Sequence, residues 1–507
     1  MDSHSMSSQV HEEQADDGAL HLPTELLIAI VDHVETDADL LTLARTSRNF
    51  HTISLERYFR KYDFNPFSKS IEIHSSASRE VLVGLGASLD VMGRSIQLLS
   101  YDSGFTQDPT KMMKEIRLLT NYISKLSCIQ CASLHVGINR LGLEKERQEL
   151  CLVFLNTILA KRCDDVSIFA SQSLLMNTEP QNIPNRSAPP EWTRRYWPAG
   201  HEPPKEQHLK NGFVHGFPRF LRPFYYHTFR TNSMTITNLS FRNIFEGGTD
   251  WAAMLVYLFF PHLRNFVLVN SIIPRDPFVK FLAKHQGTIS EFRYQNVQYV
   301  PVPESPALSD DLVPTFRYTL EKLMTAPEHI NSLMPSFASL SRLKYVLINI
   351  EEVPNRFDEV EDALRRLAGC TNKITLDIRV VVPDRPQVGM GMGIGTWLRK
   401  IFAPPVDISA ASRPERNLRC VENLLIDNGA AGFGGDSIVT HLPGWIRLFP
   451  ELKDLTLLVI PPRSYFRYGA PFPFSMEDNI LPNQSNFVEA IKTSYPGLSV
   501  RFKVRDS

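Results

Sequence analysis

The sequence predicts an α/β protein: three short N-terminal helices followed by a curved solenoid of irregular β–α units. Two observations support this fold class. An apolar pattern with helical spacing follows a polar tail at the start of the chain. Along the rest of the chain, a motif of the form L-x-x-L-x-L recurs after helical patterns. One β–α unit cannot bury its own apolar face, so such units stack on their neighbours with their strands parallel.

The composition is that of an ordinary folded protein, and it argues against several classes of function. The chain has 507 residues, of which 43% are hydrophobic and 21% are charged, and its length allows two or more domains. Its net charge of -1 creates no global field that would attract nucleic acid or an anionic membrane. The longest apolar run, residues 251–260, is about half as long as a membrane-spanning helix. We therefore expect neither a nucleic-acid partner nor a membrane partner.

Residues 1–19 are expected to form a disordered tail. They are polar and acidic, contain no Lys or Arg, and lack the features of a secretory signal or a transit peptide. Six cysteines in a chain of this length do not make a disulfide framework. We expect reduced thiols and a cytoplasmic and/or nuclear location.

Residues 20–62 are expected to form three helices. Pro23 suits the first turn of a helix, where its missing N–H costs little. Thr36 and Asp39 have the spacing of a capping box, and Thr46 and Ser47 are cap candidates for a third helix. Three such helices cannot bury their apolar residues among themselves, so another surface must cover them. The apolar face of the first helix comprises Leu26, Leu27, Ile30, Val31 and Val34.

Residues 22–62 resemble an F-box, including variants of the fungal type. The Leu-Pro opening, the acidic Glu25, the Asp39-Leu40-Leu41 step and the basic Arg48 match that family in order and spacing. The resemblance covers less than a tenth of the chain and implies binding to a Skp-type adaptor, and through it to a cullin–RING ubiquitin ligase. The adaptor-binding residues that it implies are Leu22, Pro23, Leu26, Ile30, Val34, Leu40 and Leu41. Alternatively, the three helices only cap the following domain. Both interpretations require the same residues to be buried, so the apolar pattern does not distinguish between them.

The body of the chain, residues 63–507, resembles an irregular leucine-rich repeat. Adjacent copies of the motif lie 26 to 32 residues apart, and helical patterns at 147–162, 277–285 and 357–369 precede some of them. Residues 373–382 read as a further strand. The alternative is an ordinary α/β domain in which the motif marks buried parallel strands. The motif triplets are Cys131, Leu134 and Val136; Cys163, Val166 and Ile168; Ile236, Leu239 and Phe241; Leu263, Phe266 and Leu268; Ile289, Phe292 and Tyr294; Leu343, Val346 and Ile348; Val421, Leu424 and Ile426; Leu452, Leu455 and Leu457; and Tyr495, Leu498 and Val500.

Polar stretches interrupt this array. Residues 177–212 are Pro-rich and are expected to be an exposed or disordered insertion, while 301–311 and 382–417 are expected to be loops, the latter around one short helix. The asparagines after several strands stand one residue earlier than in the repeat family, so a regular asparagine ladder is not predicted. These are Asn243, Asn270, Asn296 and Asn428.

No motif indicates an enzyme or a cofactor. Cys128, Cys131 and His135 invite a zinc interpretation, but no second close pair of ligands follows, and Cys131 and Cys163 occupy apolar strand positions. The glycines of 389–395 alternate strictly and do not directly follow a strand, unlike a dinucleotide-binding loop. We expect no metal, no cofactor and no catalytic residue, although an active site assembled from distant residues would leave no motif.

The sequence therefore predicts a non-catalytic substrate-recognition subunit of an SCF-type ubiquitin ligase. Its protein substrate would bind the outward-facing positions of the strands, where polar and apolar residues mix without a dominant charge. The alternative is a repeat protein that acts as a scaffold outside any ligase. The outward-facing residues expected to contact a substrate are Arg242, Val269, Arg293, Gln295 and Leu458.

Overall fold

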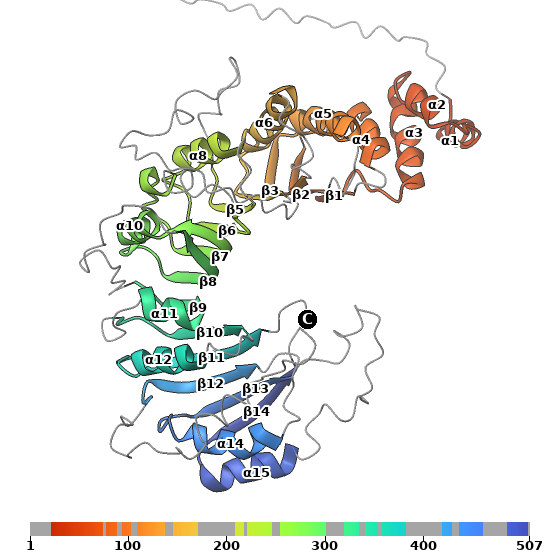
Figure 1. Ribbon diagram of the computed structural model, residues 1–507. Helices are drawn as coiled ribbons and strands as arrows, with labels where there is room; N and C mark the ends of the chain where they lie inside the picture. Colours follow the sequence, from red (N-terminus) through yellow and green to blue (C-terminus); the bar gives the residue numbers. More distant parts are fainter. Residues whose placement is uncertain are drawn as a thin grey trace, which may run out of the picture.

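The computed structural model of the protein has a small helical domain followed by a long, curved, open parallel sheet (Figure 1). The strands line the inner side of the curve and the helices cover its outer side. In the described part of the chain, no helix is long and apolar enough to span a membrane. The structure describes residues 22–74, 78–88, 94–102, 109–136, 145–170, 208–216, 221–245, 254–300, 319–333, 340–351, 357–381, 418–427, 436–459 and 484–504.

The helical domain contains α1 (Thr24–Asp32), α2 (Asp37–Leu43) and α3 (Arg48–Lys61). The predicted caps are confirmed. The Thr36 hydroxyl accepts a hydrogen bond from the Asp39 amide at 3.1 Å, and the Ser47 hydroxyl accepts one from the Phe50 amide at 3.3 Å. Both side chains satisfy amides that the helix itself leaves unpaired.

Within the described residues the sheet contains 14 strands, all parallel, and each of them pairs with the next one in the sequence. Consecutive strands can pair in parallel only if each connection crosses over a face of the sheet, from the end of one strand to the beginning of the next. The strands are β1 (Ser70–His74), β2 (Ser95–Asp102), β3 (Cys128–Val136), β4 (Asp165–Ala170), β5 (Asn211–His215), β6 (Asn238–Arg242), β7 (Asn265–Pro274), β8 (Glu291–Val300), β9 (Lys322–Thr325), β10 (Tyr345–Glu351), β11 (Ile374–Val381), β12 (Val421–Asp427), β13 (Asp454–Val459) and β14 (Ser499–Val504).

The helices of the connections cover one face of this sheet, so burial alternates along strands such as β5 and β6. Large aromatic side chains fill the layer between sheet and helices. Phe266 of β7, for example, packs against Phe278 and Phe281 of α10 with ring centroids 6.2 and 5.2 Å away. The helices are α4 (Ser78–Ala87), α5 (Pro109–Lys125), α6 (Lys145–Leu159), α8 (Arg222–Thr231), α10 (Arg275–His285), α11 (Pro327–Leu333), α12 (Phe357–Leu367), α14 (Asp436–Ile446) and α15 (Gln484–Ser494).

Most of the predicted motif positions are buried under the helices, but two triplets were placed wrongly. In β3, pairing with β4 matches Ala132 to Val166 and Leu134 to Ile168, so Leu134 is the last motif position rather than the middle one. In β14, Leu455 pairs with Val500, which makes Val500 the middle position. Both errors arose because apolar residues at neighbouring spacings also fit the pattern.

Three of the four asparagines form part of a corner that follows β6 and lies within β7 and β8. Asn243, Asn270 and Asn296 have φ angles of 52°, 49° and 48°, and Gly216 at the equivalent position of β5 has a φ of 83°. Asn and Gly tolerate this left-handed conformation, which bends the chain; in β7 and β8 the pairing resumes after the bend. Asn296 Nδ2 donates a hydrogen bond to Asn270 Oδ1 at 3.1 Å. Asn243 bonds His215 instead, so the described residues contain one such asparagine pair and not a regular ladder, in agreement with the prediction. Asn428 lies outside the described residues.

Only a small part of the predicted insertion and loops lies within the residues that the structure describes. Asn211 and Gly212, the last residues of the predicted insertion 177–212, already belong to β5, so that boundary was set too late. Residues 177–207 of the insertion, the tail 1–19, and the loops 301–311 and 382–417 lie outside the described residues.

Candidate functional site

The first candidate site is α1, which has two apolar faces. Leu27 and Val31 are buried against the other helices, with 5% and 1% of their surfaces exposed. Nine large hydrophobic side chains are exposed in the described part of the chain, and four of them lie within residues 22–30. These four are Leu22, Leu26, Ile28 and Ile30, with exposed fractions of 43%, 52%, 44% and 43%. Leu26 and Ile30 are four residues apart and lie on one side of α1 with Leu22 just before it, whereas Ile28 projects from the other side of the helix. An exposed apolar patch such as that of Leu22, Leu26 and Ile30 usually marks a protein interface.

The opposite side of the helical domain is attached to the rest of the molecule through α3. Tyr58 and Phe59 of α3 are buried, and the Tyr58 hydroxyl donates a hydrogen bond to the Glu80 carbonyl of α4 at 2.7 Å. Gly84 of α4 lies directly under the two rings. The domain therefore caps the first β–α units with α3 and leaves α1 facing away. The sequence analysis treated a cap on the following domain and a docking surface as alternatives. In the structure α3 packs on the following domain while α1 stays free for docking, so the two are compatible.

The residues that the sequence assigned to adaptor binding divide into three groups. Leu22, Pro23, Leu26 and Ile30 are exposed, and Val34 and Leu41 are partly buried against the core. Leu40 is only 3% exposed and belongs to the core. We therefore remove Leu40 from the proposed contact set: it holds α2 in place. Ile28 was missed because it lies outside the spacing of the predicted apolar face, and it is exposed on the other side of α1.

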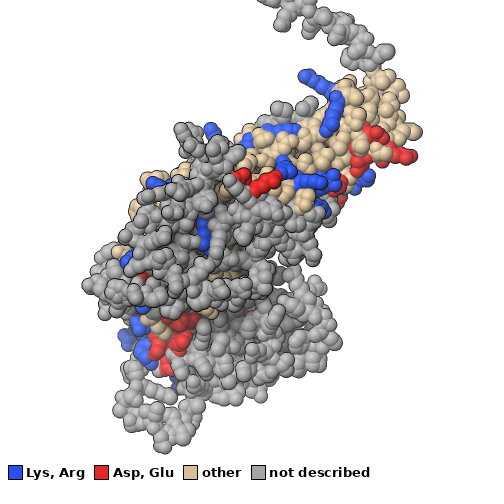
Figure 2. Space-filling model, turned by 45° about the horizontal axis from the view of Figure 1, so that its top comes forward, with Lys and Arg blue, Asp and Glu red and all other residues tan. Residues whose placement is uncertain are grey.

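Ion pairs fix the helices that carry this surface. Arg57 of α3 reaches Asp32 at the end of α1 at 2.5 Å, and Lys61 reaches Asp37 at the start of α2 at 2.7 Å. Tyr62 donates a second hydrogen bond to Asp37. Although burial acts in the opposite direction, the bonds from Lys61 and Tyr62 lower the pKa of Asp37. Figure 2 shows that much of the surface at this end of the molecule is uncharged, with acidic residues at its edge.

The second candidate site is the strand face, the side of the sheet that the helices do not cover. Arg242, Val269, Arg293 and Gln295 lie together there on β6, β7 and β8, as predicted, although Gln295 is only 8% exposed. Leu458 does not join them, because its strand, β13, is five strands away from β8. The four residues on β6, β7 and β8 therefore form one surface, and Leu458 lies apart from it.

Residues that the sequence did not single out complete the strand face. On β3, β4 and β5, the ring of His135 stacks on Phe169 with centroids 4.0 Å apart, and Phe169 lies 5.0 Å from Phe213. On β11, Asp377 is fully buried and pairs with Arg379 at 2.7 Å. These residues come from motifs with period two, and that period alone would have identified them as outward-facing.

The cysteine cluster differs from its prediction. Cys163 is buried, as expected, but Cys131 is half-exposed on the strand face, where its thiol lies 3.5 Å from an Asp165 oxygen. Cys128 is half-exposed as well, and His135 is engaged with Phe169. In the described residues, no three His, Cys, Asp or Glu side chains converge to hold a metal ion.

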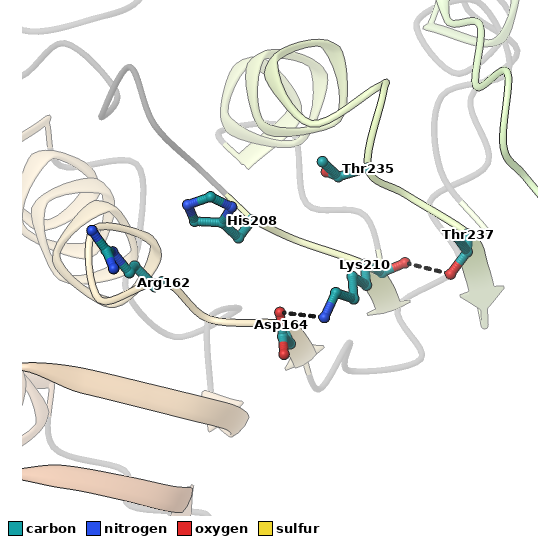
Figure 3. Close-up of a pocket in the computed structure, with 6 residues that line it drawn as sticks. All are labelled: Arg162, Asp164, His208, Lys210, Thr235 and Thr237. Carbon is teal, nitrogen blue, oxygen red and sulfur yellow. Dashed lines mark hydrogen bonds and ion pairs between the residues drawn. The ribbon is translucent and has the colours of Figure 1, made fainter.

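A polar pocket lies where β4, β5 and β6 begin (Figure 3). Lys210 pairs with Asp164 at 3.2 Å, which neutralises both charges. The Thr235 hydroxyl donates to the Leu209 carbonyl at 2.8 Å, and Thr237 bonds the Lys210 carbonyl at 3.5 Å. These hydroxyls hold the turns before the strands, so they are not poised as nucleophiles. The lining residues are Arg162, Asp164, His208, Lys210, Thr235 and Thr237.

Comparison with known proteins agrees with the geometry of the helical domain. Residues 19–64 match the family model described as F-box-like. No curated protein matches the chain. The match spans α1, α2 and α3, whose exposed apolar side chains we described above. The chain thus carries an F-box-like domain at residues 19–64.

Proposed function

We propose that this protein is the substrate-recognition subunit of an SCF-type ubiquitin ligase, in which α1 docks a Skp-type adaptor. F-box domains typically bind such adaptors, which join them to a cullin–RING ligase. The observation that carries the proposal is the exposed aliphatic surface that Leu22, Leu26 and Ile30 form on one side of α1. Roughly half of each side chain is already buried in the free protein, so complete removal from water by a partner gains about half of the value for a fully exposed side chain, roughly 0.7–1.5 kcal/mol each.

The receptor's contribution to ubiquitin transfer is proximity. It holds the substrate close to the charged ubiquitin, which raises the effective concentration of the reacting groups. The receptor itself supplies no catalytic residue in this proposal. Such a role belongs in the cytoplasm and/or the nucleus.

We also propose that the body of the chain is an irregular leucine-rich-repeat-like solenoid that binds the substrate. The sequential order of all 14 strands supports this, because a doubly wound α/β sheet would reverse its strand order. The helices on one side and the open strand face on the other are also typical of a solenoid.

Co-expression of the full chain with a Skp-type adaptor tests the proposed function. Wild type is expected to co-purify with the adaptor, whereas Ile30→Asp and Leu26→Asp are expected to lose it, because an unpaired carboxylate in the interface costs several kcal/mol. Both side chains are exposed in the free protein, so the variants should fold. Met234→Asp is the matched control: Met234 is 65% exposed and lies between α8 and β6, far along the chain from α1.

If folded wild type fails to bind the adaptor, the helices serve only as a cap and the scaffold alternative takes over. If Met234→Asp also abolishes the complex, the loss is not specific to α1. Circular dichroism and thermal melting of each variant check that it is folded.

A further inference from the structure

The strand face of β5 and β6 holds three buried polar atoms without a hydrogen-bond partner in the described part of the chain. These atoms are His215 Nδ1, Ser240 Oγ and Arg242 Nε. The register pairs His215 with Arg242, and Ser240 lies two residues before Arg242 on the same face. Buried polar groups in folded proteins are normally paired, so a cluster of three unpaired ones requires an explanation.

All three groups can donate a hydrogen bond. Arg242 is a donor only, and the Ser240 hydroxyl can rotate to donate. The amide nitrogen of Asn243 donates to Nε2 of His215, so the neutral imidazole carries its proton on Nδ1. Burial, together with repulsion from Arg242 and His135, lowers the pKa of His215 and keeps the ring neutral at neutral pH. Three donors at neighbouring positions of one face, none of them paired with an acceptor in the described part of the chain, are suited to receive an anion.

The positive charge of this surface is also uncompensated. Arg242 lies over the ring of Phe213 at 5.0 Å, and Arg293 donates a hydrogen bond to the neutral Gln295 at 2.9 Å. Neither arginine forms an ion pair with any residue of the described ranges. Burial, with repulsion from Arg242 and from Arg379, lowers the pKa of Arg293. Like charges that repel each other in a partly buried place are costly unless an anion joins them.

Arg379 lies on the same face, but its positive charge is neutralised by an ion pair. It binds Asp377 through two nitrogens, at 2.7 Å and 3.1 Å, and Tyr345 donates to the same carboxylate at 2.6 Å. This pairing raises the pKa of Arg379. Positive charge without an acidic partner is therefore found at Arg242 and Arg293 and not at every arginine of the strand face.

An aromatic surface lies beside the cationic one. Phe169 and Phe213 are half-buried, so part of each ring is open, and His135 stacks on Phe169. Val267 and Val269 of β7 lie between Arg242 and Arg293 and form an apolar floor. From β3 to β8 the face spans five strand spacings, roughly 24 Å, which about seven residues of an extended chain would cross.

We propose that the strand face of β3–β8 binds an extended protein segment that places an acidic group, a carboxylate or a phosphate, against Arg242, Arg293 and Ser240. The same segment places an apolar side chain against Phe169 and Phe213. This inference rests on the proposed function, since the segment would belong to the substrate. Arginine suits either acidic group, because its planar fork binds both with two hydrogen bonds.

The test uses the full chain and three fluorescein-labelled nonapeptide libraries with a fixed central phosphoserine, glutamate or glutamine. Fluorescence anisotropy is expected to show binding at least tenfold tighter for an acidic library than for the glutamine library. Preference for glutamate assigns a carboxylate, and preference for phosphoserine alone assigns a phosphate. Arg242→Gln and Arg293→Gln are each expected to weaken acidic binding about tenfold, since each removes a charge-assisted hydrogen bond. Ser240→Ala is expected to weaken it less.

Arg501→Gln is the matched control. Arg501 lies on the same face, in β14, but already pairs with Asp454 at 3.0 Å, so its loss should leave peptide binding unchanged. Equal binding of the three libraries, or undiminished binding by Arg242→Gln and Arg293→Gln, overturns the proposal. Tight binding of a peptide of residues 9–18, which contains Glu12, Glu13, Asp16 and Asp17, would instead identify the protein's own tail as the occupant and overturn the assignment to a substrate.

Adaptor co-purification of the same variants separates this inference from the proposed function. The arginine variants should keep the adaptor, because they leave α1 untouched. Conversely, Ile30→Asp should lose the adaptor and still bind the acidic peptides. Failure of one assay therefore does not imply failure of the other.

Discussion

Replacement of Gly84 by alanine tests how firmly the F-box-like domain is attached to the body of the protein. A Cβ atom at this position would lie 2.7 Å from Tyr58 Cε1, and 2.8 and 2.9 Å from Phe59 Cε1 and Cζ. Carbon atoms pack best at about 3.5–4.0 Å, so two rings would have to move. Both rings are buried and pack edge to face with centroids 5.6 Å apart, which leaves them little room.

The magnitude follows from a comparison within the same helix. Overpacking of this kind costs about 1–3 kcal/mol, whereas replacing a helical glycine by alanine gains about 1 kcal/mol. At Gly86 the nearest atom to an added Cβ, Asn121 Nδ2, is 3.9 Å away, so Gly86→Ala gains the helix propensity without the clash. Because propensity cancels between the two variants, Gly84→Ala should be less stable than Gly86→Ala by about 1–3 kcal/mol.

Hydrogen exchange of the amides in α3 and α4 is the appropriate assay, since it measures local opening rather than global unfolding. Faster exchange of both helices in Gly84→Ala, and slower exchange of α4 in Gly86→Ala, is the expected result. Equal protection in the two variants would refute the close packing of α3 on α4. In that case the F-box-like domain would be joined to the sheet mainly by the chain itself.

Two further predictions concern a helix cap and a buried histidine. Thr36→Ala should destabilise α2 by about 1 kcal/mol, because the Asp39 amide loses its acceptor, whereas Thr36→Asp should keep the cap. Hydrogen exchange of the α2 amides distinguishes the two variants. Equal protection of both would contradict the capping role of Thr36. His285 is fully buried and accepts a hydrogen bond from the Phe260 amide at 2.9 Å, and burial lowers its pKa to about 4. Its unfolded pKa is about 6.5, so the folded state binds fewer protons. Stability should therefore be complete above pH 6.5 and decline as the pH falls towards 4, by at most about 3 kcal/mol. His285→Gln should be less stable at pH 7 but lose less stability on acidification, and an unchanged pH dependence in urea unfolding would refute this role.

The elements of secondary structure that could be predicted from the sequence were those with a strong local signal. The caps at Thr36 and Ser47 and the helices they begin follow from interactions within four residues. The strand pattern also held for β6 to β8, where buried and outward residues alternate strictly up to the asparagine corner. The short strands β1, β5 and β9 escaped notice because few of their residues are apolar in the motif spacing. Strand β2 was overlooked although Ile96, Leu99 and Tyr101 have that spacing and are buried.

The candidate sites could be predicted only in part. The exposed face of α1 matches the residues that the F-box resemblance implied, but nothing local indicates that Leu40 is buried while Ile28 is exposed. The packing of α3 and α2 decides which side of each helix is free. Arg242 and Arg293 were predicted to face outward, but their uncompensated charge was not, since strand register brings these distant residues together without an acidic neighbour.

The sequence by itself determined the helices of the first domain with two of their caps, its F-box-like character and the clearest of the repeating strands, because each of these depends on interactions between residues close in the chain. Only the tertiary structure decided which apolar residues of α1 remain in contact with water, and which polar groups of the strand face lack a partner. Those properties depend on the register of non-adjacent segments and on what packs against them. Charge compensation shows this most directly: Arg379 has Asp377 two residues away, whereas Arg242 and Arg293 have no such neighbour and face the open side of the sheet.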